Sequence, residues 1–313
     1  MIINMQSQAE IAQRTELIAW VESMRPENTR QAYGTYGPKY LKYAQENNMN
    51  PKSEVTLAMF MKTAHEEGLG RTTVTGSIPS AVANIYRYED LKLSTSVLVK
   101  QVKKVILEQS KPSIQKLPIQ ISHLMTMGRK VQPCFEQVRN FFLILIMTLG
   151  MLRESEAVAL TVMDVNVDAI QDEVYLIVKV VKSKTDQIRS GHTVLIGAGR
   201  NKFLCPVKWF QIYLNFRFLG CTSLFHAVPK GGVMPKPLVK NTPCHIVQRA
   251  LTRLVENPML YGSHSCRRGG VTAAVQAKVD MLLIARHGNW KSTAVYLYVP
   301  DSVERKLSVS QSM

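Results

Sequence analysis

The stretch from Tyr261 to Tyr298 reads YGSHSCRRGGVTAAVQAKVDMLLIARHGNWKSTAVYLY, and the rest of the chain can be interpreted around it. His264 and Arg267 stand three positions apart. On a helix their side chains would point the same way, with Cβ atoms roughly 5–6 Å apart. Two donors on one face suit an anionic group with several oxygens, such as a phosphodiester. A tyrosine nearby is then a possible nucleophile.

The charge of the chain supports an anionic partner. The formal net charge is +16 and the sequence pI is about 9.7. Residues 1–110 hold 13 Lys and Arg against 11 Asp and Glu, whereas residues 111–313 hold 26 against 12. A field of one sign this large favours nucleic acid over an anionic membrane as the partner. Charge of this kind can also serve solubility alone.

Cysteine usage and hydropathy exclude several other classes of protein. The five cysteines are scattered, with no C-x-x-C pair, which argues against a disulfide framework or a zinc site and suits a reducing compartment. The first ten residues lack the pattern of a signal peptide. The most apolar run, Phe141 to Leu152, is shorter than the about 20 residues that span a bilayer. We therefore expect a soluble protein, with no membrane contact, metal or other cofactor.

Periodicity predicts two domains that are mainly α-helical with a small antiparallel β-sheet. Residues 111–118 contain two prolines and two lysines between helical patterns and are interpreted as a linker. A β-branched run at 174–181 and a second at 192–196 predict a hairpin. The expected helices are 9–24, 30–47, 55–67, 72–89 and 94–108 before the linker, and 119–130, 135–149, 157–160, 205–219, 239–254 and 264–277 after it.

The second expected helix, capped by Asn28 or Thr29, alternates tyrosines with basic residues. Two interpretations remain open for this pattern. Residues such as Arg30 and Tyr33 could lie along a DNA backbone. The tyrosines could equally be part of a hydrophobic core.

Six residues outline a family pattern when they are taken in chain order. An arginine lies in MLRESEAVAL, a lysine in the expected hairpin, a His-x-x-Arg pair on a helix, a tryptophan after a glycine and a tyrosine near the end. They are Arg153, Lys184, His264, Arg267, Trp290 and Tyr298. In this order and at these intervals the chain resembles the tyrosine recombinases, also called phage integrases, over nearly its whole length. The runs HSCRRGGVTAA, RHGNWKS and YVPDS are similar to the recombinases of DIRS-type and Crypton-type mobile elements.

The resemblance implies an architecture and a reaction. Residues 1–110 would form a helical, SAM-like core-binding domain, and residues 119–313 the catalytic domain. Tyr298 would attack a DNA phosphodiester to form a 3′-phosphotyrosyl bond, and the broken strand could then be rejoined without metal or ATP. Arg153 and Arg267 would clamp the non-bridging oxygens, which suit a planar guanidinium.

The other family positions imply supporting roles. His264 would orient or deprotonate the tyrosine, and Lys184 would protonate the leaving 5′-oxygen. Glu156 and His287 would support the site. The residues expected to touch double-stranded DNA are Arg30, Tyr33, Arg71, Thr73, Lys182, Arg268 and Lys291. The resemblance also implies a dimer on each site, a tetramer in synapsis and a nuclear location.

Several assignments stay open at this stage. Lys182 competes with Lys184, and Tyr296 competes with Tyr298. Counting from Gly288, the family's His/Trp position falls on Asn289, with Trp290 and His287 as the alternatives. The chain could also be a domesticated recombinase that binds DNA without cutting it, or a strand transferase of the type IB topoisomerase kind.

Overall fold

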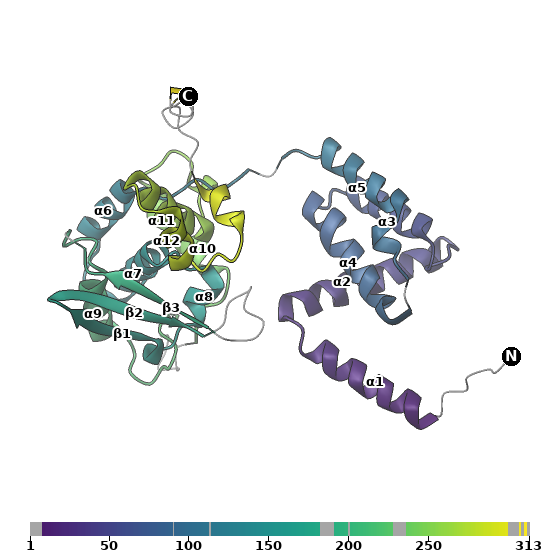
Figure 1. Ribbon diagram of the computed structural model, residues 1–313, viewed down its shortest axis with the longest axis horizontal. Helices are drawn as coiled ribbons and strands as arrows, with labels where there is room; N and C mark the ends of the chain where they lie inside the picture. The colour runs from purple at the N-terminus through teal and green to yellow at the C-terminus, as the bar shows by residue number, and fades with distance from the viewer. Residues whose placement is uncertain are drawn as a thin grey trace. The chain divides into compact units, whose positions relative to one another are not determined.

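The computed structural model describes residues 8–89, 91–112, 114–181, 191–199, 201–227 and 236–299, together with 307, 310 and 311. The chain divides into two compact units, residues 1–113 and 114–313, drawn in Figure 1. Each unit has a core of its own. Among the described residues, no helix combines the length and the apolar character needed to cross a membrane.

Unit 1 is entirely helical in its described part. Its α-helices are α1 (Gln8–Ser23), α2 (Glu27–Glu46), α3 (Glu54–Glu66), α4 (Ile78–Ile85) and α5 (Val97–Gln109). Helix α2 packs on α4, and α3 packs on α5. Tyr40 of α2 is fully buried between them and donates its hydroxyl hydrogen to the carbonyl of Pro51 at 2.6 Å. At this position the core interpretation of the tyrosines is the right one.

Two helix starts in unit 1 differ from the sequence prediction. Helix α2 begins at Glu27, three residues early, because the carbonyl of Pro26 accepts the first backbone N–H groups and neither Asn28 nor Thr29 acts as the cap. The expected helix at 72–89 opens with a π-helical turn, Thr73–Ser77, before α4. Ser53 caps α3 through its hydroxyl.

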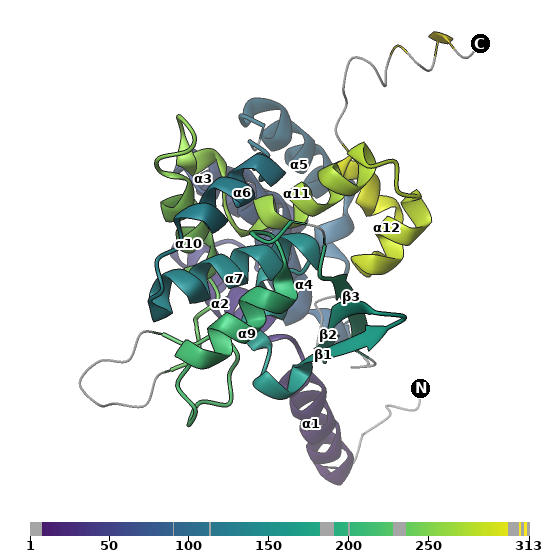
Figure 2. The ribbon, with the colours of Figure 1, turned by 90° about the vertical axis from the view of Figure 1, so that its left-hand side faces the viewer.

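Unit 2 is built around helix α7 (Phe135–Leu149), in which every residue from Phe141 to Thr148 is buried. A continuous apolar run thus forms a central helix. Helices α9 (Pro206–Phe216), α10 (Thr242–Leu251) and α11 (Ser263–Gln276) pack against α7, as Figure 2 shows. The α-helices of this unit are α6 (Ile121–Lys130), α7 (Phe135–Leu149), α8 (Glu154–Ala159), α9 (Pro206–Phe216), α10 (Thr242–Leu251), α11 (Ser263–Gln276) and α12 (Met281–His287).

In the described part of unit 2, the sheet has three antiparallel strands in the order β1-β2-β3, where the sequence predicted two. The strands are β1 (Val165–Ile170), β2 (Glu173–Val180) and β3 (His192–Gly197). Strand β1 was not predicted, although its residues 165–169 alternate apolar and polar side chains; only Val165 in it is buried. In register, Val178 lies between Val165 and Val194. The mainly helical class with a small antiparallel sheet is as predicted.

Two consecutive glycines bring α11 close to its neighbours. A Cβ on Gly269 would lie 2.3 Å from the carbonyl oxygen of Ile119, and one on Gly270 would lie 2.2 Å from that of Thr148. Any larger residue would push α11 away from α7 and from the segment that leads into α6. The Arg-Arg-Gly-Gly sequence therefore sets Arg267 and Arg268 against the body of unit 2.

Candidate active site

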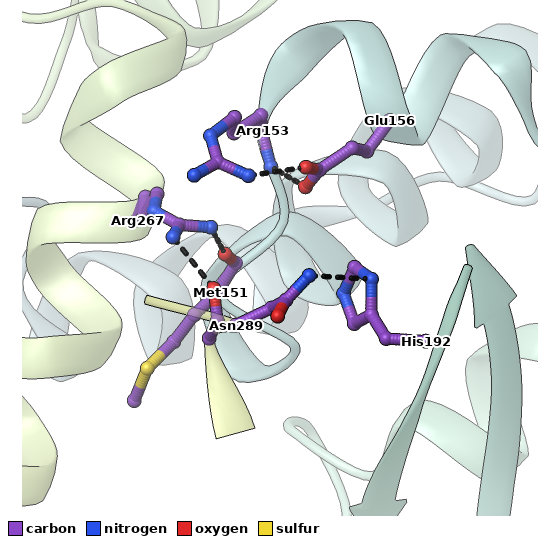
Figure 3. A network of polar contacts seen from close by, with 7 residues as sticks. Met151, Arg153, Glu156, His192, Arg267 and Asn289 are labelled. Carbon is purple, nitrogen blue, oxygen red and sulfur yellow. Dashed lines mark hydrogen bonds and ion pairs between the residues drawn. The ribbon is translucent and has the colours of Figure 1, made fainter. Parts of the chain in front are cut away.

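Arg267 is the centre of the candidate site and is only 2% exposed. Its guanidinium donates one hydrogen bond to the carbonyl of Met151 and another, at 2.6 Å, to that of Gly288 (Figure 3). The ring of Trp290 lies over the same guanidinium, with its centroid 3.6 Å away. Two backbone carbonyls from distant parts of the chain and one aromatic face thus fix this charge, and no carboxylate within the described ranges forms an ion pair with it.

Arg153 approaches from the N-terminus of α8 and is held by Glu156. The Glu156 carboxylate accepts from the Arg153 guanidinium at 2.6 Å and from the Arg153 backbone N–H at 2.7 Å. Glu156 is 1% exposed, whereas the Arg153 side chain is 19% exposed. The guanidinium therefore keeps partial access to solvent while its position is fixed from behind.

The two guanidiniums lie near one another, and their charges interact (Figure 3). Burial lowers the pKa of Arg267 to about 10, and the positive charge of Arg153 adds to the decrease, while Glu156 and Tyr298 oppose it. At neutral pH Arg267 still carries its charge. A pair of cations held this way is suited to binding the non-bridging oxygens of a phosphate.

Tyr298 ends a 3₁₀ segment, Thr293–Tyr298, and lies beside this pair. Its ring meets the edge of Trp290 with centroids 5.4 Å apart, and its hydroxyl lies close enough to Arg267 to oppose the decrease in the pKa of that guanidinium. The competing tyrosine, Tyr296, lies on the same segment, is 58% exposed and is absent from these contacts. Of the two tyrosines, Tyr298 is the one that lies with the arginines.

The three candidates for the His/Trp position lie in or next to the turn at residues 288–290, and each has a different contact. Asn289 has φ of 53° and its side-chain amide lies 3.0 Å from Nδ1 of His192 (Figure 3). Trp290 covers Arg267. His287 contacts the carbonyl of Leu149 on α7 at 2.8 Å. The tryptophan therefore serves the arginine, the asparagine faces β3 and the histidine faces α7.

His264 is exposed in the first turn of α11, three residues before Arg267. The residue before it, Ser263, is buried and donates its hydroxyl to the carboxylate of Glu154 in α8. This contact joins the start of α11 to the start of α8. The two elements that carry His264 and Arg153 are thereby held together.

The remaining predicted residues fall into three groups. Lys182 and Lys184 fall outside the described residues. Lys291 is exposed next to the turn, and Arg268 is partly buried beside Tyr298. Arg30, Tyr33, Arg71 and Thr73 belong to unit 1, where Arg30 pairs with Glu27 and Tyr33 stacks under Arg25.

Some members of the site left no signal in the sequence. The carbonyls of Met151 and Gly288 are acceptors that any residue type could supply. His192 was assigned only to a strand, and its contact with Asn289 spans 97 positions. Among the described residues, no three His, Cys, Asp or Glu side chains converge on a position that could hold a metal ion.

Comparisons with known proteins identify the fold. No family model matches the chain, and no curated protein matches it. Among solved structures, the XerH site-specific recombinase bound to palindromic difH substrate, in a post-cleavage complex, has a TM-score of 0.62 at 18% identity and covers 90% of this chain and 78% of its own. The Tn1549 transposon integrase with circular intermediate DNA scores 0.54 at 14% identity, covering 83% and 85%.

A lambda integrase dimer bound to a COC′ core site scores 0.53 at 12% identity and covers 95% of this chain and 82% of its own. The chain therefore has the tyrosine recombinase fold. Identities this low establish the fold, and the chemistry has to be argued from the residues of the site.

Proposed function

We propose that this protein is a tyrosine-type DNA recombinase that cuts and rejoins DNA through a covalent bond to Tyr298. The observation that carries the proposal is the buried Arg267, held under Trp290 with Tyr298 on one side and the Arg153–Glu156 pair nearby. Burying a charge is unfavourable unless it is well partnered. A guanidinium fixed among neutral carbonyls and next to a tyrosine is an arrangement suited to phosphate chemistry.

The reaction would proceed as a balanced exchange of phosphate esters. The Tyr298 oxygen attacks phosphorus, a P–O bond to tyrosine forms, and the bond from phosphorus to the 5′-oxygen breaks. The tyrosine proton passes to a base, for which His264 is our candidate, and the leaving oxygen receives a proton, which we assign to Lys184 on its sequence position alone. Attack by a 5′-hydroxyl on the phosphotyrosine reverses these steps and needs no other energy source.

The two arginines would stabilise the charge that develops on the phosphate oxygens. Groups fixed before the reaction act strongly in a partly desolvated site, and loss of one such donor costs about 10²–10³ in rate in comparable cases. Glu156 would keep Arg153 in place. Trp290 would hold both the guanidinium of Arg267 and the ring of Tyr298.

The proposal extends to the partner, the assembly and the origin of the protein. Unit 1 would bind DNA, and the active form would be a dimer on each site and a tetramer in synapsis. A mobile element would encode the protein, which would act in the nucleus. The XerH, Tn1549 and lambda structures were all determined with DNA, and the lambda integrase is described as a dimer. The charge of +16 supports a nucleic-acid partner.

Covalent capture of DNA tests the proposal directly. The probe is a library of nicked duplexes with randomised sequence, end-labelled and selected for binding to the protein. We expect a labelled band on a denaturing gel that migrates with the 35.3 kDa chain. Tyr298→Phe should abolish the band and keep binding, whereas the matched control Tyr296→Phe should leave both intact.

Two other outcomes would replace the proposal. Binding without any band from the unaltered protein would favour a DNA-binding protein that no longer cleaves. A band together with relaxation of a supercoiled plasmid by isolated protomers would favour strand transfer of the topoisomerase kind. A band that survives Tyr298→Phe would show that another residue is the nucleophile.

A further inference from the structure

Arg268 occupies a position that the proposed reaction does not yet use. It follows Arg267 on α11, and its guanidinium carbon lies 5.9 Å from the centroid of the Tyr298 ring, within the range of a cation–π contact. The same guanidinium donates a hydrogen bond to the side-chain oxygen of Gln115 at 2.7 Å. No acidic side chain among the described residues forms an ion pair with it.

Gln115 belongs to a short segment that is fastened along the start of α11. We name residues 115–119 the strap. Its attachments join Lys116 to the carbonyl of Met259 at 2.6 Å, the N–H of Leu117 to Leu260 at 2.8 Å and the N–H of Ile119 to Ser265 at 3.0 Å. The strap is therefore fixed at Lys116, Leu117 and Ile119, directly after the position from which Gln115 reaches Arg268.

Gly269 is what lets the strap lie so close. A Cβ at this position would be 2.3 Å from the carbonyl oxygen of Ile119. The residue directly before this close approach is Arg268, so its backbone is set against the strap as its side chain extends past Gln115. Nε of Arg268 is buried and has no hydrogen-bond partner among the described residues. In the described part of the chain, the guanidinium thus contacts Gln115 and the Tyr298 ring.

Three side chains thus lie close to Tyr298. Trp290 and Arg267 belong to the site already described, and Arg268, which is bonded to Gln115 of the strap, is the third. We propose that Arg268 is a positioning residue that fixes the Tyr298 ring for attack through its attachment to Gln115, and that it is not primarily a DNA-phosphate contact. This rests on the proposed function of Tyr298 as the nucleophile.

The two roles predict different kinetic results. If Arg268 positions Tyr298, Arg268→Ala should lower the single-turnover rate of adduct formation at saturating DNA by about 10- to 100-fold, since small displacements of reacting groups commonly have effects of this size. The dissociation constant for DNA should stay close to that of the unaltered protein. If Arg268 instead binds phosphate, the dissociation constant rises, its salt dependence falls by about one charge, and the rate at saturation is unchanged.

Gln115 provides the second, more specific test. Gln115→Ala should lower the same rate by a smaller factor, and the double variant should be no slower than Arg268→Ala alone, because Gln115 acts only through Arg268. Losses that multiply in the double variant would overturn the proposal. Arg268→Lys should not restore the rate, because an ammonium lacks the planar fork that can face both partners. Arg249→Ala on α10, where the side chain is 82% exposed, is the control.

A measurement without DNA separates this inference from the proposed function. Hydrogen–deuterium exchange of residues 293–299 should be faster in Arg268→Ala and in Gln115→Ala than in the unaltered protein or the Arg249→Ala control. If the unaltered protein forms no adduct, the proposed function fails, and the exchange result still reports whether Arg268 holds Tyr298. Unchanged exchange in both variants would refute the positioning role.

Discussion

Replacing Glu156 by glutamine should destabilise unit 2 far more than the same change on the surface. Glu156 is 1% exposed and accepts two hydrogen bonds from Arg153, at 2.6 and 2.7 Å. Glutamine has nearly the same shape but offers one acceptor, and its amide group would face a donor of Arg153. The change also removes the negative charge that offsets the interaction between Arg153 and Arg267.

The magnitude follows from the burial of the two partners. Breaking a buried ion pair from one side costs about 3–5 kcal/mol, because a buried charge is left without its partner. Solvent reaches 19% of the Arg153 side chain and screens part of this effect. We therefore expect the lower end, about 3 kcal/mol. At about 2–4 °C per kcal/mol for a unit of 200 residues, the melting temperature should fall by about 6–12 °C.

The control is a second Glu–Arg pair in the same unit. Glu136 lies 3.6 Å from Arg249, and both side chains are well exposed, so Glu136→Gln should cost less than about 1 kcal/mol. Unfolding would be followed by urea titration with far-UV circular dichroism and tryptophan fluorescence. If the two variants differ by less than 1 kcal/mol, the argument that Glu156 anchors Arg153 is refuted.

Two further predictions concern packing and pH. Gly288→Ala should reduce adduct formation by about 10-fold or more with DNA binding retained, because the new Cβ would lie 1.7 Å from the Trp290 ring and displace the ring from Arg267. The control is Gly197→Ala, where no atom lies within 4 Å of the new Cβ. Equal activity of the two variants would contradict this prediction. His226 is buried, and burial lowers its pKa from the ordinary value of 6.5. Below about pH 6.5 the unfolded state therefore binds a proton more readily than the folded state, and the free energy of unfolding decreases as the pH is lowered. Urea titrations from pH 7 to 5 should show this slope reduced in His226→Phe, and an equal slope in both proteins would count against it.

The neutral form of His226 explains the direction of that shift in structural terms. Its Nδ1 lies 2.9 Å from the carbonyl of Ala227, and its Nε2 accepts the backbone N–H of Phe218 at 3.3 Å. A second proton on Nε2 would point at a donor. Burial under Phe135 and the nearby charges of Arg139 and Arg217 act in the same direction.

Much of the fold follows from sequence patterns because each pattern has one dominant physical cause. The run that begins at Phe141 is too apolar to be anything but interior, and it forms the buried part of the central helix α7. Strands β2 and β3 follow from their β-branched residues. Strand β1 was missed although VNVDA alternates apolar and polar residues; five of its six residues are exposed, and its backbone pairs with β2.

In the site, too, some members could be predicted from the sequence and others could not. Arg153, Arg267 and Tyr298 are recognisable because their side chains have to be of particular types. The groups that hold them are mostly backbone carbonyls and packing contacts, such as Met151 and Gly288, whose identity the sequence does not constrain in an obvious way. The tyrosines of α2 are visible in the sequence, but their role is not. A pattern of aromatic and basic residues cannot distinguish a hydrophobic core from a binding surface until the burial of each side chain is known.

The 288–290 turn shows why motif position alone was ambiguous. After α12 ends, the N–H of Trp290 bonds back to Ala285 at 2.8 Å, and Asn289 takes a left-handed conformation that asparagine tolerates better than most residues. This geometry aims the Gly288 carbonyl and the Trp290 ring at the same guanidinium, while Asn289 turns to His192. A tryptophan directly after the glycine would fall at the left-handed position, where a bulky side chain is strained. The order Gly-Asn-Trp therefore places the small polar residue where the backbone demands it and the aromatic ring where Arg267 and Tyr298 need it.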